Sequence, residues 1–528
     1  MTVIDENKKL YLGLDLSTQQ LKCTLINEEH HITYEEAVHF DRDLPEFGTK
    51  YGAIVNDDVV TSPTLMWVKA LDLLLTRLKK TGLMPLVQGI SGAGQQHGSV
   101  YWNKEGINQL NHLDAKRSLF QQLENGFSIT QSPIWQDAST TQECRHLEKS
   151  VGGPEQLASL TGSKAYERFT GNQIAKIYHH NREAYNQTEY IGLVSSMLAT
   201  LLLGQFSPVD TAEGSGTNMM NIRTHKWDEK LLYECGGDAL KEKLAKEPVE
   251  GSTVLGNINP YYVERYGFKP ECKIVSFTGD NSATLVSMNL LEGDCVVSLG
   301  TSDTVLVYLK KDAAATTESH LMVHPIDSEG FMGMLCYKNG SLTREHIRNI
   351  YADGSWETFN SIITKNEAMF DDCLGFYYWM QEIIPFAKGI YRFQKGTLVN
   401  EFDDKQVNVK AIVESQFMSM KIRLERMGGH MKRVLASGGA ASNPILLQLL
   451  SDIFGLPVYR QKGMNGASLG GALLAKYAIQ DKSFNDMMAE FPSTGLDLIC
   501  QPDMTKTEKY KQCENQFIKL ERSIIDTL

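Results

Sequence analysis

The hydrophobic pattern near the start of the chain predicts a strand, a turn and a second strand. Leu10–Leu16 is an apolar run, Ser17–Gln20 is polar, and Leu21–Ile26 alternates between apolar and polar residues. Alternation with a period of two is typical of a strand with one buried face. The same succession returns far along the chain, where the strands Cys295–Leu299 and Thr304–Leu309 flank a turn that contains Thr and Ser. Such a repeat suggests two duplicated domains that face one another.

Other segments alternate strand and helix, as α/β proteins do. Apolar strands are predicted at Val87–Ser91, Ile274–Phe277 and Val434–Ser437, and each ends in a loop of small or polar residues. A helix is predicted to begin at Pro63, with Thr61–Ser62 supplying its cap. The pattern therefore predicts an α/β fold.

Length and charge narrow the class of protein. A chain of 528 residues is too long for one compact core, so we expect two domains or a few. The formal net charge is -12, with no cluster of Lys and Arg strong enough to overturn it. A protein that binds nucleic acid would be expected to carry a basic face, so we expect no nucleic-acid partner.

Cysteines and apolar stretches favour the cytoplasm. The nine cysteines include no C-x-x-C pair, which favours reduced thiols over a disulfide framework or a zinc site. Residues 1–9 are acidic and polar, unlike a signal peptide. The most apolar stretch, Ile191–Gly204, is short and interrupted by Ser and Thr, so it is typical of a buried helix rather than a membrane span. We expect no membrane partner.

The first turn is a candidate phosphate site. Ser17, Thr18 and the turn amides can donate hydrogen bonds to phosphate oxygens, and Gly13 would let a ligand approach the backbone. A carboxylate beside phosphates makes sense if Asp15 holds Mg²⁺, through water. A plain hairpin with a capping aspartate would explain the same residues. The second turn, with Thr301, would complete a clamp on a nucleotide tail.

Two further loops follow strands and carry chemistry. Ligands of open α/β sheets bind at the carboxyl ends of strands, which places Asp280 well to accept a proton from a substrate hydroxyl. An aspartate that only caps a helix is the alternative. His97 lies in a glycine-flanked loop, where it binds a ligand or simply forms a structural hydrogen bond.

The loop Gly438–Asn443 joins a strand to a helix without bulky side chains. A flat ring such as adenine could lie against this backbone, although tight helix packing would give the same composition. The loop does not match the dinucleotide pattern G-x-G-x-x-G, and the phosphate loop G-x-x-x-x-G-K-[ST] does not occur in the chain.

These motifs, in this order, resemble the FGGY family of carbohydrate kinases, which share a duplicated actin-like ATPase fold. The most specific segments are Ser91–Gly98, Ala165–Gln173, Phe277–Asn281 and Ser298–Thr304. The resemblance implies two actin-like, ribonuclease H-like domains, 1–270 for the sugar and 271–528 for ATP, with the active-site cleft between them. It departs at Ser17, where the family often has glycine.

The resemblance also implies roles for individual residues. His97, Arg168, Asp280 and Asn281 would bind the sugar, and Asp280 would be the general base. Contacts with the adenosine of ATP are implied for Trp356, Gly438, Gly439, Ala440 and Asn443. Together with Ser17, Thr18 and Thr301 of the two turns they make up the expected ATP site, and Asp15 is the expected metal ligand.

The implied reaction is phosphorylation of D-xylulose by Mg-ATP, in a monomer or a homodimer. Alternatives within the same family are kinases of ribulose, gluconate or glycerol. A non-kinase actin-like ATPase, such as a chaperone or filament protein, is the alternative from a different class, although such a protein needs no sugar base.

Overall fold

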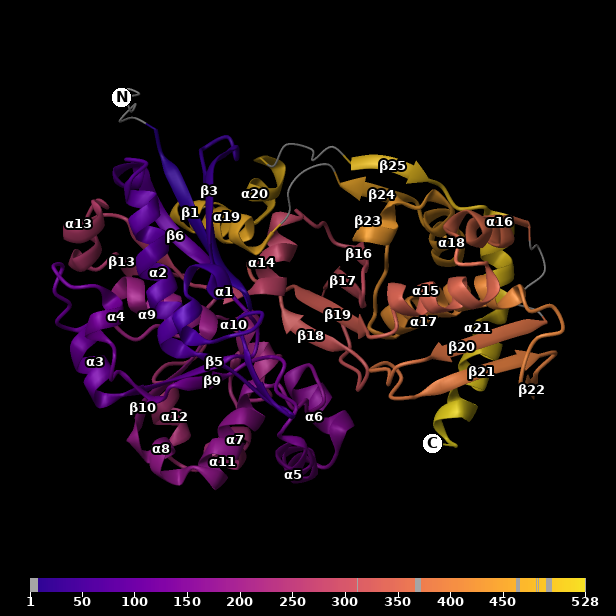
Figure 1. Cartoon of the computed structure of the whole chain (residues 1–528), viewed down its shortest axis with the longest axis horizontal. Coiled ribbons are helices and arrows are strands. Elements are labelled where there is room, and N and C mark those ends of the chain that lie inside the picture. The colour runs from indigo at the N-terminus through magenta and orange to yellow at the C-terminus, as the bar shows by residue number, and fades with distance from the viewer. Residues whose placement is uncertain are drawn as a thin grey trace. The chain divides into compact units, whose positions relative to one another are not determined.

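A computed structural model describes residues 8–310, 312–365, 372–461, 466–480, 482, 484–490 and 496–527. The chain forms two compact units (Figure 1). Among the described residues, unit 1 contains those up to Asn289 and those within Met322–Gly330 and Met464–Pro492. Unit 2 contains those within Leu290–Leu321, Phe331–Gly463 and Ser493–Leu528.

Unit 1 is built on a seven-stranded sheet. Its main path has the order β13 (Val254–Asn257), β14 (Lys273–Val275), β6 (Val87–Gly94), β1 (Leu10–Leu16), β2 (Gln20–Ile26) and β3 (Ile32–His39), and β15 (Thr278–Gly279) also pairs with β6. The strands β1, β2 and β3 form an antiparallel meander, whereas β6 runs parallel to β1, β14 and β15.

Unit 2 is built on a second seven-stranded sheet. Its order is β18 (His320–Val323), β19 (Phe331–Tyr337), β17 (Asp303–Leu309), β16 (Asp294–Leu299), β23 (Arg433–Ser437), β24 (Val458–Gln461) and β25 (Leu496–Cys500). β16, β17 and β19 are antiparallel neighbours, and β23 runs parallel to β16 and β24.

The two sheets repeat one topology. Reading outward from β3 or from β19, each sheet has three antiparallel strands, then two parallel strands, then an antiparallel strand at the edge. The turns β1–β2 and β16–β17 are therefore equivalent, as are the loops that follow β6 and β23. The α/β fold and the internal repeat predicted from the strand–turn–strand pattern are confirmed.

The helices of unit 1 pack on its sheet and around it. α2 (Thr64–Lys79) contacts β2 and β3, and α19 (Ala467–Gln480) contacts β1, β2 and β6. The other helices are α1 (Phe40–Asp43), α3 (Lys104–Leu110), α4 (Leu119–Gln122), α5 (Thr141–Val151), α6 (Pro154–Thr161), α7 (Thr170–His180), α8 (Arg182–Gln187), α9 (Val194–Leu203), α10 (Thr211–Gly214), α11 (Glu229–Gly236), α12 (Leu240–Leu244), α13 (Pro260–Tyr266), α14 (Asp280–Ser287) and α20 (Phe484–Glu490).

Smaller sheets and the helices of unit 2 complete the fold. In unit 1 the short strands are β4 (Ile54–Asn56), β5 (Val59–Pro63), β7 (Ser99–Asn103), β8 (Phe127–Ile129), β9 (Gln131–Pro133), β10 (Thr188–Leu193), β11 (Met220–Asn221) and β12 (Lys226–Trp227). Unit 2 adds α15 (Ser341–Tyr351), α16 (Trp356–Lys365), α17 (Val407–Arg426), α18 (Pro444–Phe454), α21 (Met504–Ile525), β20 (Cys373–Tyr378), β21 (Gly389–Gln394) and β22 (Thr397–Val399).

Gly13 has a packing role that the sequence interpretation missed. A Cβ atom at this position would lie 1.8 Å from the carbonyl oxygen of Ser468 and 2.3 Å from the backbone nitrogen of Ala472. Both atoms belong to α19, so the glycine lets this helix lie directly on β1. The expectation that Gly13 admits a ligand was wrong, because α19 fills that space.

The predicted domain boundary at 270/271 stays a prediction, but it differs from the limits of the compact units. β14, β15 and α14 all follow residue 270 and belong to unit 1. α19 is far along the chain and also packs into unit 1.

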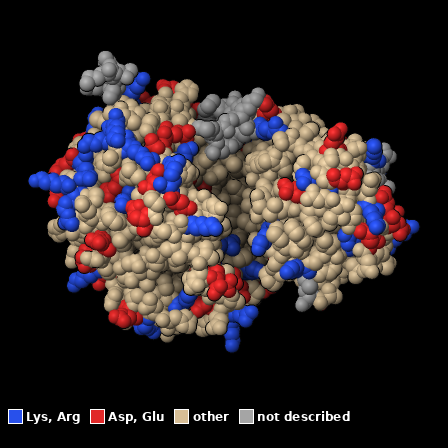
Figure 2. Space-filling view, viewed as in Figure 1, with Lys and Arg blue, Asp and Glu red and all other residues tan. Residues whose placement is uncertain are grey.

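On the face shown in Figure 2, acidic and basic side chains are interspersed over both units. Within the described part of the chain, no helix combines the length and the apolar character needed to cross a membrane.

Candidate active site

Three strands of unit 1 end together and bring the predicted residues to one edge of the sheet. Ala93 on β6 is paired with Asp15 on β1 and with Thr278 on β15. Because β6 is parallel to both neighbours, the loops after their carboxyl ends start at the same level. The loop after β6 begins at Gln95, and β15 leads directly into Asp280. The sheet register thus places Asp15, Asp280 and the His97 loop at one edge.

Asp280 is the first residue of α14 and is half-buried. Its Oδ1 accepts hydrogen bonds from the Asn281 backbone N–H at 2.8 Å and from Asn281 Nδ2 at 3.2 Å. Burial raises the pKa of Asp280 to about 6, although hydrogen bonds from the backbone of Asn281 and Gln96 oppose the rise. A carboxyl group with this pKa is mostly ionised at neutral pH and is a stronger base than an ordinary aspartate.

Asn281 connects Asp280 to the loop after β6. Its Nδ2 also donates to Oε1 of Gln96 at 2.9 Å. A Cβ atom at Gly279 would lie 2.7 Å from Cγ of Gln96, so the glycine allows this close approach. Gln96 was not singled out from the sequence beyond its place in the His97 loop, and the structure assigns it this bridging contact.

His97 is held in one orientation by two contacts. Its Nδ1 lies 2.8 Å from the carbonyl oxygen of Gly216, and its ring stacks on Phe169 with centroids 4.4 Å apart. Burial and the charge of Arg168 lower the pKa of His97 to about 3, so the ring is neutral. A carbonyl partner requires a hydrogen on Nδ1, which leaves Nε2 as an acceptor for a hydroxyl.

Arg168 belongs to the same group of side chains as His97. Its guanidinium carbon lies 4.7 Å from the ring centre of Tyr166 and 5.5 Å from that of Phe169. Cations over aromatic faces are favourable, and the planar guanidinium remains a donor along its edges. Four predicted sugar-binding residues, His97, Arg168, Asp280 and Asn281, are therefore connected in unit 1 through Phe169 and Gln96.

The side chains of the first turn are partly occupied by their own hairpin. The Ser17 hydroxyl donates to the carbonyl oxygen of Gln20 at 3.0 Å. The indole N–H of Trp135 donates to Oγ1 of Thr18 at 2.9 Å, which leaves the Thr18 hydroxyl hydrogen available for another acceptor. Thr18 is thus the better donor for a phosphate, and Trp135 is a neighbour that the sequence interpretation missed.

Asp15 has a buried oxygen that lacks a protein partner. Its Oδ1 makes no hydrogen bond with any described residue. Burial raises the pKa of Asp15 to about 7, with a further rise from the charge of Asp280 and a reduction from Lys22. A buried carboxylate oxygen of this kind suits a hydrated cation. The described residues contain no group of three or more His, Cys, Asp or Glu side chains placed to hold a metal by themselves.

In unit 2, Gly438 brings the loop after β23 against the end of β16. Its φ is 84°, and a Cβ atom there would lie 2.6 Å from the carbonyl oxygen of Leu299. Only glycine fits such a conformation and contact without strain. Thr301 follows Leu299 closely in the β16–β17 turn, so the second hydroxyl turn lies beside the predicted adenosine loop. In contrast, a Cβ atom at Gly439 would have no described neighbour within 4 Å.

Asn443 connects that loop to the helix that starts at Trp356. Its Oδ1 accepts from the backbone N–H of Ile445 at 3.0 Å and caps α18, and its Nδ2 donates to Asn360 on α16 at 2.8 Å. Trp356 is 37% exposed, and the centre of its ring lies 4.6 Å from the guanidinium carbon of Arg348. The residues implied at adenosine therefore come from two connected helices and the Gly438 loop.

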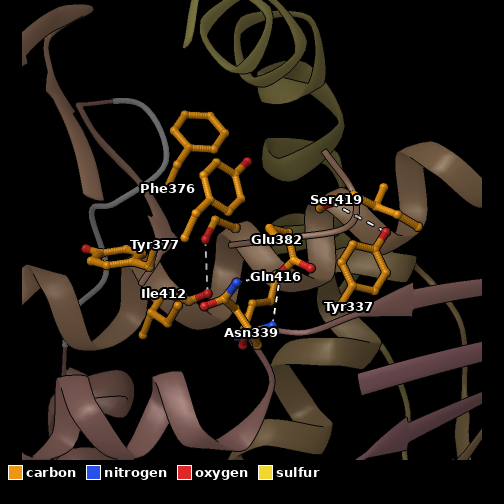
Figure 3. A pocket seen from close by; sticks show the side chains of 11 residues that line it. Tyr337, Asn339, Phe376, Tyr377, Glu382, Ile412, Gln416 and Ser419 are labelled. Atoms are coloured by element: carbon orange, nitrogen blue, oxygen red, sulfur yellow. Dashed lines mark hydrogen bonds between the residues drawn. The ribbon is translucent and has the colours of Figure 1, made fainter. Parts of the chain in front are cut away.

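Unit 2 also contains a pocket of about 330 Å³ that is lined by other residues than those predicted for the site (Figure 3). Side chains of β19, β20 and α17 line it, among them Tyr337, Phe376 and Gln416. Its polar groups pair with one another, since Glu382 accepts from Nδ2 of Asn339 at 3.0 Å and from three backbone N–H groups. None of its lining residues was singled out from the sequence.

Comparisons with known proteins find matches along nearly the whole chain. The profile of the FGGY family of carbohydrate kinases, N-terminal domain, matches residues 10–287, and that of the C-terminal domain matches residues 295–479. A xylulose kinase of Rattus norvegicus is 44% identical over 527 residues, which cover 98% of this chain and 97% of the relative. A xylulose kinase of Schizosaccharomyces pombe is 42% identical over 504 residues, with 90% of each chain covered.

Solved structures share the fold. The xylulose kinase from Rhodospirillum rubrum superposes with a TM-score of 0.80 and covers 98% of this chain and 99% of its own. The sequence identity is 16%, so this likeness concerns the architecture of the two units.

Proposed function

We propose that this chain, which belongs to the FGGY family of carbohydrate kinases, transfers the γ-phosphoryl group of ATP to D-xylulose and forms D-xylulose 5-phosphate. One observation carries the proposal. A half-buried aspartate whose pKa is raised to about 6 lies at the carboxyl ends of the strands of unit 1, beside side chains that are able to hydrogen-bond hydroxyls, in a chain whose near-full-length relatives are named xylulose kinases.

The sugar would be held by groups of complementary hydrogen-bonding character. The Asp280 carboxylate and His97 Nε2 accept, Arg168 donates, and the Asn281 amide can do either. Several hydroxyls can be satisfied at once in this way, and a substrate that lacks one of them would leave a buried partner unpaired.

Asp280 would act as the general base. The carboxylate takes the proton of the O5 hydroxyl while O5 forms a bond to the γ-phosphorus, and the bond from that phosphorus to the bridging β–γ oxygen breaks. The products are the sugar phosphate, ADP and a protonated Asp280, which then loses its proton to solvent. The pKa of about 6 fits this cycle, because the group is ionised before transfer and deprotonates readily afterwards at neutral pH.

Unit 2 would bind ATP. The Gly438–Ala440 backbone would lie against the adenine, with Trp356 and Asn443 at the adenosine, while Thr301 would donate to phosphate oxygens. Ser17 and Thr18 of unit 1 would contact the phosphates too. Asp15 would hold Mg²⁺ through water, and its unpartnered Oδ1 fits that role. The cation would neutralise charge on the phosphates.

This function is tested by measuring ADP release from ATP in the presence of each of a panel of sugars. D-xylulose should stimulate ADP release far more than ribulose, gluconate or glycerol. If the protein prefers one of those three, it is still a kinase of this family, but the proposed substrate is wrong. ATP turnover that ignores every sugar would favour a non-kinase actin-like ATPase and would overturn the proposal.

A further inference from the structure

Glu213 is a buried carboxyl near the proposed base that the transfer does not use. Its side chain is 1% exposed, and Oε1 has no hydrogen-bond partner among the described residues. It lies close enough to Asp280 and Asp210 for their charges to act on it, and these charges together with burial raise its pKa well above the usual range. Burial and the neighbouring charges therefore favour the un-ionised form of Glu213.

The carboxyl of Glu213 connects segments that surround the site. Its Oε2 accepts a hydrogen bond from the Ser195 hydroxyl at the start of α9. A Cβ atom at Gly94 would lie 2.4 Å from the backbone nitrogen of Ser195, so this end of α9 abuts the end of β6. The next residues after Gly94 form the loop of Gln96 and His97. Glu213 thus braces the helix that supports this loop.

Glu213 belongs to the segment 210–216, which also contacts two parts of the proposed sugar site: the strand that precedes Asp280, and His97. Asp210 precedes it and caps α10 by accepting the Glu213 backbone N–H at 2.9 Å, and α10 packs against β15. Thr278 lies on β15, two residues before Asp280. On the other side, the carbonyl oxygen of Gly216 lies 2.8 Å from His97 Nδ1. Residues 210–216 therefore reach from the strand of the base to the histidine.

We propose that Glu213 is a positioning residue, whose carboxyl group holds Ser195 and the 210–216 segment so that Asp280 and His97 keep their mutual placement. It touches neither sugar nor phosphate in this account. The inference rests on the proposed function, since it concerns the orientation of the groups that bind and activate the sugar. Removal of the polar head would leave the Ser195 hydroxyl buried and unpaired, and the segment would shift.

Two variants whose side chains have a volume similar to that of Glu213 distinguish the loss of its polar contact from a change in packing. Glu213→Gln keeps an oxygen that can accept from Ser195 and resembles the un-ionised acid, so its kcat and its KM for D-xylulose should stay within about threefold of the parent's. Glu213→Met keeps the length but has no comparable acceptor. Misplacement of a catalytic group by about 1 Å can cost about 100-fold in rate, so we expect kcat to fall about 10- to 100-fold with the KM for ATP unchanged.

A matched control lies in the same unit. Asp72 is also buried, and it accepts hydrogen bonds from Leu119, Phe120 and the Tyr266 hydroxyl. Asp72→Leu should lower the unfolding temperature, as Glu213→Met does, but leave kcat per folded molecule unchanged. Both variants are scored on the fraction that still binds ATP, which corrects for misfolded protein.

The outcomes are distinct. Loss of kcat in Glu213→Met with rescue in Glu213→Gln supports the inference. Equal loss in both would show that a charged carboxylate is needed, and a parental kcat in Glu213→Met would show a role in stability alone; either result overturns it. If the parent protein itself fails to phosphorylate D-xylulose, the proposed function fails, and Glu213 is then tested with the sugar that the panel identifies.

Discussion

Asp15 and Thr278 stand at the same level on opposite sides of β6, because each is paired with Ala93. Asp280 follows Thr278 by two residues, so the candidate metal ligand and the candidate base meet at one sheet edge. The charge of Asp280 acts on Asp15 and helps to raise its pKa to about 7. Two carboxyls placed in this way suit a reaction in which one group takes a proton and the other holds the cation at the phosphates.

Replacement of Asp280 by alanine tests the base. General base catalysis contributes about 10²- to 10⁴-fold to a rate, so kcat of Asp280→Ala should fall by at least about 100-fold. ATP affinity, measured by calorimetry, should remain near the parent's, because the residues proposed at adenosine lie in unit 2. Near-normal turnover in this variant would remove the assignment.

The pH profile tests the ionisation of the same group. The pKa of Asp280 is raised to about 6, so the active, ionised form is present above this pH and is lost as the pH falls through it. kcat/KM for the sugar should therefore drop below about pH 6. His97, whose pKa is lowered to about 3, does not titrate in this range.

The Asp280→Asn variant shows which group causes the pH dependence of the rate. The residual rate of Asp280→Asn should be nearly independent of pH between about 5.5 and 7, since the titrating base is gone. If the drop in rate at low pH is unchanged in that variant, another carboxyl causes it, such as Asp15 or Asp210, whose pKa values burial raises to about 7.

Arg168 should matter for the sugar and not for the nucleotide. Arg168→Ala removes a donor from the group formed with Tyr166 and Phe169, so KM for D-xylulose should rise by about tenfold or more, as for loss of a charged hydrogen bond. Arg168→Lys keeps the charge but lacks the planar fork, and should recover only part of the affinity. Calorimetry that shows weaker ATP binding and normal sugar binding would contradict this map of the site.

Two adjacent glycines offer a matched test of the adenosine loop. Gly438→Ala should lower the stability of unit 2 by about 1–3 kcal/mol and weaken ATP binding, because a side chain is strained at φ 84° and would press on Leu299. Gly439→Ala should leave the unfolding temperature unchanged, since its Cβ atom meets no described atom within 4 Å. Thermal unfolding of both variants and ATP titration of Gly438→Ala check this, and equal unfolding temperatures of the two variants would refute it.

The sequence pattern predicted the strands of the two repeats well, because Leu10–Leu16 and Cys295–Leu299 are apolar and bounded by polar turns. The helix expected at Pro63 begins one residue later, at Thr64. Residues 59–63 are strand β5 instead, since they pair with β9. A local cap signal could not reveal that partner, which lies far along the chain.

The candidate site was predictable to the extent that its residues sit in loops after strands. Asp280 and His97 follow that rule, and register then explains why they meet. Gln96, Trp135 and Glu213 were missed as individual residues, because their roles come from contacts with residues distant in sequence. Gly13 shows the reverse error: a glycine beside a presumed ligand proved to accommodate α19, which comes from the other end of the chain.

The most direct measurement of the central claim is the fate of the γ-phosphoryl group. The protein is mixed with ATP labelled at the γ-phosphate and with D-xylulose, and the labelled products are separated over time. We predict that the label appears in D-xylulose 5-phosphate in equal amount to the ADP formed, and that Asp280→Ala abolishes this transfer. Label that accumulates as inorganic phosphate at the same rate with and without the sugar would contradict the account.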